Sequence, residues 1–586
     1  MKKNPNVKGR IFPRLMRYVG RQRWLLVGAV VCALAGNAAL LTAPKLIGWA
    51  IDRILPGADA GPGLTLLQIL MMIGLLYVLG SALNWVTALL ANLVANRTVK
   101  DLRVELFHKL GHMPVAYFDT HSRGDIMSRF TNDIDAISDG LNQGIVQLVT
   151  GVITVILTML FMLTLSPMVT LVAVLVAPLC FVVGFVITRY GSRRFAEQSR
   201  VLGWLNGYAE EIITGQRTVK AFGYEQRAGE RFGEINEQLY QCGYRAQFAS
   251  ALVNPSTRFV NNVAYVLVGV FGIVAHLTPG VIASFLTYTA QFSKPFNEIT
   301  AITMQLQLAM ASARRIFQVM DEKEEAPDAS ETLREPEGRV RFEDVDFSYT
   351  PKRPLIRNFH LDVEPGMTVA IVGPTGAGKT TLVNLLMRFY EADQGIIAVD
   401  GQSIYSVSRD SLRRQFGMVL QETWLFAGTV RDNIAYGRPD ATDEQVEEAA
   451  RAAHAHSFIR RLPEGYRTMI AEDGGNLSQG QKQLLTIARA MLLDPPMLIL
   501  DEATSSVDIV TEQRIQKAFR RMMQGRTTFV IAHRLSTIRD ADRILVLDKG
   551  NVVETGTHEE LLARKGFYHH LYNSQFAAAG REDEAV

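Results

Sequence analysis

Cysteine is scarce in this sequence, and charge is nearly balanced. Three cysteines stand at Cys32, Cys180 and Cys242, and none shows a CxxC or metal-ligand spacing. A sparse, odd-numbered set argues against a disulfide framework and a cysteine-based metal site. The formal net charge of +3 is small for 586 residues and gives no basic surface of the kind that nucleic-acid binding requires. We therefore expect no nucleic-acid partner.

Charge is missing altogether from four long stretches of the first half. The stretches without Asp, Glu, Lys or Arg are Trp24–Pro44, Ala60–Asn96, Leu141–Thr188 and Phe259–Ser293. A helix that crosses a bilayer needs about 20 mostly apolar residues. The third stretch is interrupted at Ser166–Pro167 and the fourth at Thr278–Pro279–Gly280, so each holds two helices, the last one continuing past Lys294. The sequence therefore predicts six membrane spans.

The charges that flank these stretches predict the orientation. The N-terminus and the segments 97–109 and 189–231 are basic, whereas the turns at Ser166 and Thr278 are uncharged. Cytoplasmic segments are enriched in Lys and Arg, so we expect both chain ends on the cytoplasmic side of the cell (inner or plasma) membrane. The first apolar run is long enough to span, and we interpret it as a retained helix rather than a cleaved signal.

Two connections between spans, about 97–140 and 189–258, are too long to be simple loops. Their mixtures of apolar residues and paired charges predict helical arms that extend below the membrane. Aromatic residues mark the ends of both arms, namely Tyr117, Phe118, Phe222 and Tyr224. Such residues favour contact with a cytosolic domain over solvated arms without a partner.

One charged pair interrupts the sixth span. Lys294 and Glu298 are four residues apart beside Pro295. Charged residues at membrane depth usually face a cavity or a pathway. Two residues at this spacing can instead pair on one helix face near the interface. Both interpretations stay open on the sequence alone.

The second half reads as a soluble enzyme. Residues 321–338 are acidic and contain proline, which predicts a linker between a membrane domain at 1–320 and a soluble domain at 339–576, with a tail at 577–586. Strand-like runs then alternate with helical stretches, an order that indicates an α/β domain with a mainly parallel sheet. These runs are Val340–Phe347, Met367–Val372, Gly395–Val399, Met497–Leu500, Thr527–Ile531 and Arg543–Leu547.

The strongest chemical signal is a glycine-rich loop between a strand and a helix. It matches G-x-x-x-x-G-K-[ST], whose glycines let backbone N–H groups surround phosphates at a helix N-terminus. Its residues, which we expect to bind a nucleotide, are Gly373, Pro374, Thr375, Gly376, Ala377, Gly378, Lys379, Thr380 and Thr381. Lys379 is predicted to reach the β- and γ-phosphates, and the Thr380 hydroxyl to bind Mg²⁺.

Two adjacent carboxylates end a second buried strand. Asp501 and Glu502 follow four apolar residues, and side chains alternate along a strand, so the two acids point in different directions. Asp501 suits the Mg²⁺ shell, and Glu502 is then predicted to polarise the attacking water. Alone, an apolar run followed by two acids is weak evidence for a nucleotide-hydrolysing site, but together with the phosphate-binding loop it is strong evidence.

Between the two motifs lies Leu477-Ser-Gln-Gly-Gln481, and this order resembles the nucleotide-binding domain of ATP-binding cassette (ABC) proteins, whose signature is LSGGQ. The resemblance implies roles for further residues, each assigned by its motif. Tyr349 matches the aromatic residue that stacks on adenine, and Gln421 matches the glutamine that senses Mg²⁺. The signature is matched by Ser478, Gln479, Gly480 and Gln481, and the acidic residue before it by Glu472. Ser505–Asp508 matches the loop that crosses to the partner domain, and His533 matches the switch histidine at the γ-phosphate. Lys379, Glu502 and His533 are then the catalytic residues, with Thr380, Gln421 and Asp501 around Mg²⁺.

The membrane half resembles that of ABC exporters. Stretches from Tyr117 to Asp133 and from Glu211 to Phe222 look like the two cytosolic connections of that family. Six spans ahead of one cassette is the plan of an exporter half-transporter, which implies a second half-transporter as partner. Gln479 replaces the usual signature glycine, although the hydrolytic residues are complete. This combination favours a heterodimer over a homodimer.

The resemblance implies export of an amphipathic substrate (a drug, lipid, peptide or siderophore) out of the cytoplasm, driven by ATP with Mg²⁺ through alternating access after dimerisation. An ATP-gated channel or regulatory membrane protein is the alternative, and Glu502 and His533 argue for continued turnover instead. A soluble cassette ATPase is excluded by the six predicted spans.

Overall fold

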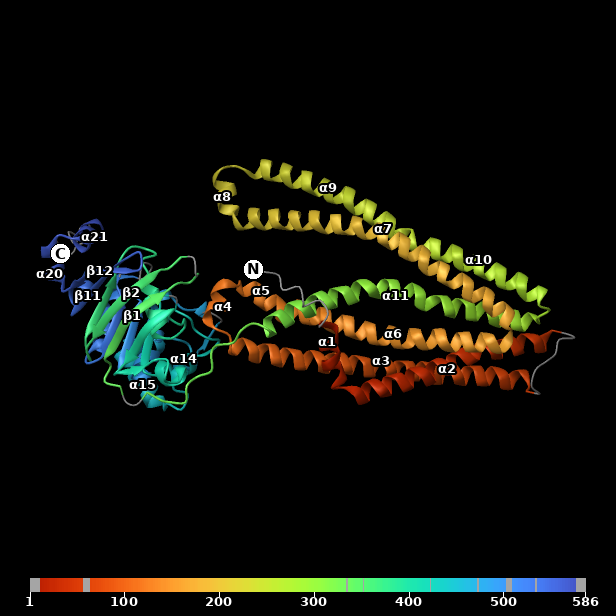
Figure 1. The fold of residues 1–586 in the computed structure, drawn as a ribbon, viewed down its shortest axis with the longest axis horizontal. Helices are drawn as coiled ribbons and strands as arrows, with labels where there is room; N and C mark the ends of the chain where they lie inside the picture. Colours follow the sequence, from red (N-terminus) through yellow and green to blue (C-terminus); the bar gives the residue numbers. More distant parts are fainter. Residues whose placement is uncertain are drawn as a thin grey trace. The chain divides into compact units, whose positions relative to one another are not determined.

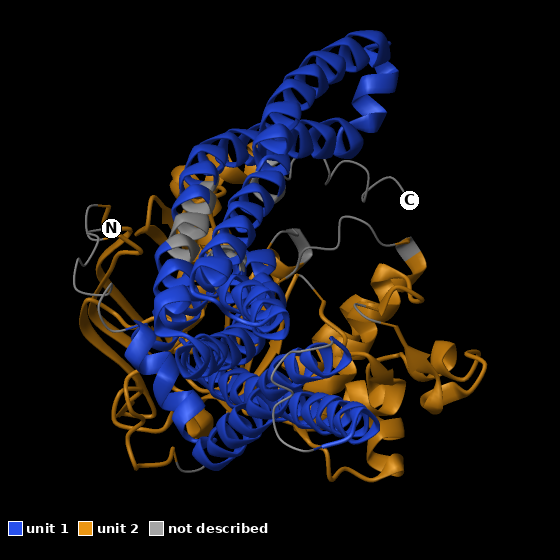
Figure 2. Ribbon diagram, turned by 90° about the vertical axis from the view of Figure 1, so that its right-hand side faces the viewer, with its two compact units in different colours: residues 1–113, 121–324 blue, residues 114–120, 325–586 orange. Residues whose placement is uncertain are grey.

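A computed structural model describes the chain in eight segments. They are residues 11–55, 64–333, 336–350, 353–421, 423–471, 474–501, 508–532 and 535–575. The chain divides into two compact units: unit 1 comprises Met1–Met113 and His121–Glu324, and unit 2 comprises Pro114–Thr120 and Glu325–Val586 (Figure 2). Unit 2 therefore includes one short segment taken from the first half of the sequence.

Unit 1 is built from long helices (Figure 1). The described part of each predicted span lies in one helix, and these are α2 (Arg23–Ile54), α3 (Leu66–Gly111), α6 (Ile134–Leu165), α7 (Pro167–Thr214), α10 (Val253–Val274) and α11 (Pro279–Met320). Among the described residues, four helical segments are long and apolar enough to cross a membrane: Arg23–Ile54, Leu66–Gly111, Arg123–Leu165 and Glu225–Val274. α7 and α11 are not among these four. In α11, the side-chain N of Lys294 and O of Glu298 lie 3.8 Å apart, so these two residues form an ion pair between positions four apart on one helix.

The breaks predicted within the long apolar stretches are confirmed. Ser166 lies between α6 and α7 in an extended conformation, and Pro167 is the first residue of α7, where its missing N–H is not needed. Thr278 caps α11, because its hydroxyl accepts a hydrogen bond from the Val281 N–H. The buried Asp52 of α2 accepts hydrogen bonds from the Thr278 hydroxyl (2.6 Å) and the Gly280 N–H (2.8 Å), which joins the two helices.

Among its described residues, the first half of the chain contains five shorter helical segments and one further long helix, α9. They are α1 (Ile11–Gly20), α4 (Val115–Thr120), α5 (Arg123–Ser128), the π-helix Arg129–Asp133, α8 (Gln216–Ala221) and α9 (Glu225–Ala251). α7 and α9 run side by side and are joined through α8, so the second predicted arm is a helical hairpin (Figure 1). At its end Phe222 is 82 % exposed, and the predicted contact of this arm with a cytosolic domain stays a prediction.

Unit 2 contains two main sheets. The larger has the strand order β12-β11-β3-β10-β9-β6 and is parallel except for β12. Its strands are β3 (Thr368–Val372), β6 (Phe416–Val419), β9 (Met497–Asp501), β10 (Thr527–Ile531), β11 (Arg543–Asp548) and β12 (Asn551–Gly556). The smaller sheet is antiparallel, with the order β2-β1-β4-β5, and comprises β1 (Val340–Phe347), β2 (Ile356–Val363), β4 (Gln394–Val399) and β5 (Gln402–Ser403). A third pair joins β7 (Gly428–Thr429) to β8 (Met469–Ile470).

The predicted parallel sheet thus holds four of the six predicted strands, and β1 and β4 belong to the antiparallel sheet. The reason is visible in β1, where Arg341 is exposed between the buried Val340 and Phe342. A strand with one solvated face is typical of antiparallel sheets, whereas the strands of a covered parallel sheet are buried on both faces. The alternation of buried and exposed residues along β1 is the sequence signal that distinguishes a strand of the antiparallel sheet from one of the parallel sheet.

Helices cover both faces of the parallel sheet. One core cluster combines Leu498 and Leu500 of β9 with residues of α17 (Gln479–Leu493) and α18 (Ile509–Met523). The other combines Met497 and Ile499 with α12 (Lys379–Leu386). The remaining helices are α13 (Arg409–Arg413), α14 (Val430–Ile434), α15 (Asp443–Ala452), α16 (His456–Ile459), α19 (Leu535–Arg539), α20 (His558–Arg564) and α21 (Phe567–Gln575), with 3₁₀ turns at Ala435–Gly437 and Gly465–Arg467.

Candidate active site

The glycine-rich loop joins β3 to α12, as predicted. Gly378, the residue before α12, has φ +99°, a left-handed conformation that glycine adopts at no steric cost. At Gly373 a side chain would collide with the carbonyl oxygen of Leu547 on β11. Both glycines are therefore required by the local backbone, and the loop ends at an α-helix N-terminus, where backbone N–H groups and the helix dipole favour anions.

Lys379 is the first residue of α12 and folds back over this loop. Its ammonium donates hydrogen bonds to the carbonyl oxygens of Gly373 (2.7 Å) and Pro374 (3.2 Å). Burial lowers the pKa of the Lys379 ammonium, and the nearby carboxylate of Asp501 opposes that effect. The cation is thus held partly desolvated beside the loop, where its attraction for a phosphate is stronger than in bulk water.

Asp501 and Gln421 reach the same place from neighbouring strands. Asp501 ends β9, and Gln421 follows β6, the adjacent parallel strand. The carboxyl ends of parallel strands lie at one edge of a sheet, which is where the loop after β3 also begins. Side chains alternate along β9, so Asp501 points to the face that carries Met497, Ile499 and α12.

Tyr349 lies at the rim of this site. Its side chain is 47 % exposed, and its hydroxyl is 3.1 Å from the Thr381 hydroxyl of α12. Its ring packs edge-to-face on Phe347 and on Tyr390, with centroid distances of 4.8 and 4.9 Å. One face of the aromatic ring is therefore fixed by packing, and an exposed surface remains for stacking.

These residues line a single hollow of about 530 Å³. Its lining consists of Tyr349, Leu355, Thr375, Gly376, Ala377, Gly378, Lys379, Thr380, Thr381, Gln421, Asp501 and Ile531. The Thr380 hydroxyl, the Gln421 amide oxygen and the Asp501 carboxylate are hard oxygen donors of the kind that Mg²⁺ prefers. This donor set fits a magnesium ion bound together with a nucleotide. Sequence reasoning missed Leu355 and Ile531, because apolar residues beside a strand carry no distinguishing signal.

Several of the predicted residues lie outside the described part of the chain. They are Glu472, Glu502, His533 and, in the predicted partner-facing loop, Ser505, Ser506 and Val507. Their neighbours are described: Glu502 follows Asp501, and His533 follows the residue after β10. Asp508, the last residue of the predicted partner-facing loop, caps α18, where a hydrogen bond from the Thr511 N–H (2.9 Å) lowers the pKa of its carboxyl.

The signature residues do not line the hollow. Ser478 caps α17: its hydroxyl accepts from the Gln481 N–H (3.3 Å), and the Gln481 side chain accepts from the Ser478 N–H (2.9 Å). Both Ser478 and Gln479 are exposed, whereas Gly480 is buried. The 15-residue helix α17 therefore exposes a capped, partially positive N-terminus on the surface of unit 2.

Gln479 does not strain the signature. It is the first residue of α17 with helical backbone, and its side-chain amide donates to the Thr423 hydroxyl at 3.3 Å. The glycine that usually occupies this position is thus not needed for its conformational freedom. We expect Gln479→Gly to lower the stability of the cassette by about 1 kcal/mol or less, and to change ATP hydrolysis little. Thermal denaturation and an ATPase assay test this; a several-fold rise in turnover would show that the side chain obstructs the site.

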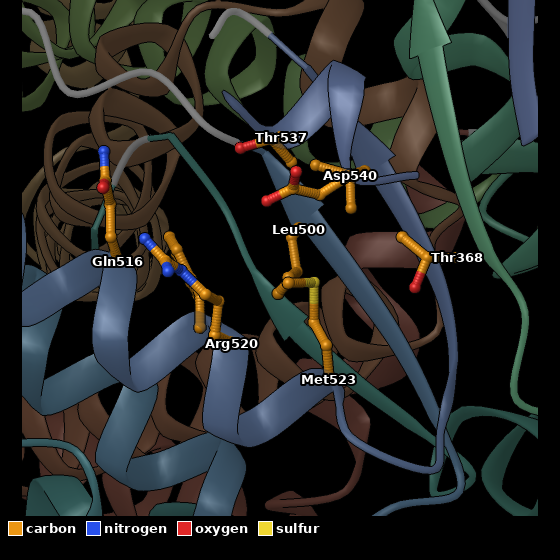
Figure 3. Close-up of a pocket in the computed structure, with 9 residues that line it drawn as sticks. Thr368, Leu500, Gln516, Arg520, Met523, Thr537 and Asp540 are labelled. Carbon is orange, nitrogen blue, oxygen red and sulfur yellow. The ribbon is translucent and has the colours of Figure 1, made fainter. Parts of the chain in front are cut away.

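A second, smaller hollow of about 80 Å³ lies elsewhere in unit 2. Figure 3 shows Gln516, Arg520 and Met523 on α18 facing Leu500, Thr537 and Asp540. Leu500 precedes Asp501 on β9, so its side chain points to the opposite face of the sheet. This hollow is separate from the loop that contains Lys379.

Comparison with known proteins agrees with this geometry in both units. Residues 26–296 match the family described as ABC transporter transmembrane region, and residues 356–505 match ABC transporter. A fatty acid ABC transporter ATP-binding/permease protein of Mycobacterium bovis is 44 % identical over 613 aligned positions, which cover 97 % of each chain. The chain belongs to the ABC exporters. It is an ATP-hydrolysing half-transporter and a multi-pass membrane protein.

Two further relatives support the assignment of the chain to the ABC exporters. An ATP-dependent lipid A-core flippase of Syntrophus aciditrophicus is 37 % identical, with 97 % of this chain and 94 % of the flippase covered. The solved structure of a bacterial Atm1-family ABC exporter with ATP bound is 30 % identical, with a TM-score of 0.77 and coverage of 94 % of this chain and 98 % of that chain. The six-helix plan plus cassette is therefore that of an exporter that acts as a dimer in the bilayer.

Proposed function

We propose that the hollow around Lys379 holds ATP with one Mg²⁺ ion. Tyr349 stacks on adenine, and the loop from Gly373 to Thr381 surrounds the phosphates. The oxygen atoms of Thr380, Gln421 and Asp501 would hold the magnesium ion, whose charge would offset the negative charge of the phosphates. The convergence of Lys379, Asp501 and Gln421 from three parallel strands on one hollow is the observation that carries this proposal.

Hydrolysis needs two more residues of this chain. Glu502 accepts a hydrogen bond from the attacking water and orients it, and His533 contacts the γ-phosphate. Both follow the ends of strands, β9 and β10, that reach the same edge of the sheet as the loop. This order along the chain supports their assignment, because the neighbours of both residues are in place.

A second cassette completes the site. Ser478 lies outside the hollow and caps an exposed helix N-terminus, which suits contact with ATP held by a partner. Two cassettes then enclose two nucleotides, and the pair is the state that ATP stabilises, because ATP binds it better than the separated cassettes. We favour a heterodimer, with a homodimer as the alternative. ATPase activity of this chain purified alone, proportional to the square of its concentration when dilute, would establish the homodimer instead.

The proposed substrate is a lipid with a long acyl chain, which the protein moves out of the cytoplasm across the cell membrane. The N- and C-termini of the protein are proposed to lie in the cytoplasm. Relatives named for fatty acid transport and lipid A-core flipping cover nearly the whole chain, membrane unit included. The test uses vesicles with the cassettes outside and radiolabelled palmitate as the probe. We expect accumulation that requires ATP and Mg²⁺ and disappears in Lys379→Ala. ATP-dependent hydrolysis without any accumulation of palmitate would reject this substrate, and currents far above pump rates would favour an ATP-gated channel.

A further inference from the structure

The smaller hollow of unit 2 lies beside α18, on the face of the parallel sheet that carries α17 and α18. Its floor is formed by three buried apolar side chains, those of Leu500 on β9, Val530 on β10 and Phe519 on α18. Met523 of α18 adds its thioether to the same lining (Figure 3). The inside of the hollow therefore favours an apolar group over a polar one.

The size of this hollow limits what can enter it. A water molecule occupies about 30 Å³ in the liquid, so a space of about 80 Å³ takes about three groups of methyl size. Ordered water needs about two to four polar partners, which the buried side chains of the floor do not offer. The space therefore suits a branched apolar group of about three carbons, such as an isopropyl group.

Side chains of opposite charge stand at the rim of the hollow. Arg520 and Gln516 extend from α18, and Asp540, the residue after α19, lies across the hollow from them together with Thr537 (Figure 3). Arg520 and Asp540 are both exposed. The carboxylate of Asp540 lies 3.8 Å from its neighbour in sequence, Arg539, and no ion pair joins it to Arg520 among the described contacts. The rim thus offers one cation and one anion on either side of an apolar space.

We propose that this hollow binds a small zwitterion with a branched apolar group, namely an α-amino acid of the size of valine. The guanidinium of Arg520 donates to the carboxylate of the ligand, the ammonium of the ligand donates to Asp540, and its isopropyl group fills the hollow. A simple anion would be repelled by Asp540 and a simple cation by Arg520, whereas a ligand with both charges is attracted by both. No described residue lines both this hollow and the one around Lys379, so the inference does not rest on the proposed ATP site.

The test measures binding of L-valine to the full-length protein in nanodiscs by saturation-transfer NMR, with empty nanodiscs as the background. We expect saturable binding, with the strongest transfer to the methyl groups of the ligand. Three probes each lack one part of valine: isovalerate lacks the ammonium, isobutylamine lacks the carboxylate, and glycine lacks the side chain. Because the rim charges are exposed, we expect loss of either charge to weaken binding by at least about threefold. Loss of the buried side chain is expected to weaken it by at least about tenfold.

Point variants place the ligand in this hollow. Arg520→Gln and Asp540→Asn each remove one rim charge from an exposed position, and each is expected to weaken L-valine binding by at least about threefold. Met523→Phe puts a larger side chain into the lining and is expected to abolish saturable binding. Arg521→Gln is the matched control, because Arg521 is exposed on the same helix and does not line the hollow. Its L-valine binding is expected to stay within about twofold of wild type.

Three results would overturn the proposal. The first is an absence of saturable L-valine binding at millimolar concentrations. The second is binding of isovalerate or isobutylamine as tight as that of L-valine, which would leave a site for one charge only. The third is equal L-valine binding by wild type, Arg520→Gln and Asp540→Asn, which would place the ligand elsewhere on the protein. If thermal denaturation shows that Met523→Phe does not fold, the two rim variants still decide the question.

Discussion

Lys379→Ala is expected to lower ATP hydrolysis by at least about 100-fold, the usual cost of removing one preorganised charge stabiliser. The Lys379 ammonium lies partly buried beside the loop carbonyls of Gly373 and Pro374, and its pKa is lowered by that burial. Without it, the hollow loses the ammonium group that is proposed to offset the negative charge of the phosphates. Binding of a fluorescent ATP analogue and steady-state release of phosphate measure the effect.

The control for this variant is Lys517→Ala. Lys517 is an exposed residue of α18, outside the hollow that contains Lys379. Its removal takes the same charge from unit 2 and should leave hydrolysis within about twofold of wild type, as surface substitutions usually do. Equal losses in both variants would contradict a specific role for Lys379.

Glu502→Gln is expected to stop hydrolysis while ATP binding is retained. The amide keeps the size of the carboxylate but accepts a proton poorly, so the attacking water is no longer polarised. We expect turnover to fall by about 100-fold or more, and ATP to remain bound through gel filtration together with a paired cassette. The assay is radiolabelled ATP retained per chain, beside wild type. Rapid ATP turnover in Glu502→Gln would contradict the role of this glutamate.

Much of the site was predictable because its residues follow strands and carry chemical signals. A loop such as Gly373–Thr381 is recognisable by its glycines and lysine, and Asp501 by its place after four apolar residues. The parallel arrangement of β3, β9 and β6 then brings Lys379, Asp501 and Gln421 together. The order of the strands in the sheets could not be predicted from the sequence, and the antiparallel sheet with β1 and β4 was missed.

Long-range ion pairs could not be predicted. Nothing in the acidic run from Asp321 to Glu331 shows which acid faces which arginine, since surface-like charges have no periodic pattern. The structure assigns Asp321 and Glu324 to one unit and Glu325 and Asp328 to the other. Tyr390 was missed for a similar reason, because its partners Tyr349 and Asp119 lie 41 and 271 residues away in sequence.

The most direct measurement is an experimental structure of the Glu502→Gln protein in lipid with ATP and Mg²⁺, purified with the chain that accompanies it. The account predicts one nucleotide whose γ-phosphate is contacted by Lys379, whose magnesium ion is bound by Asp501, and whose far side is covered by the signature serine of a second cassette. A nucleotide bound with Lys379 and Asp501 on different sides of the cassette, or enclosed by one cassette alone, would contradict it.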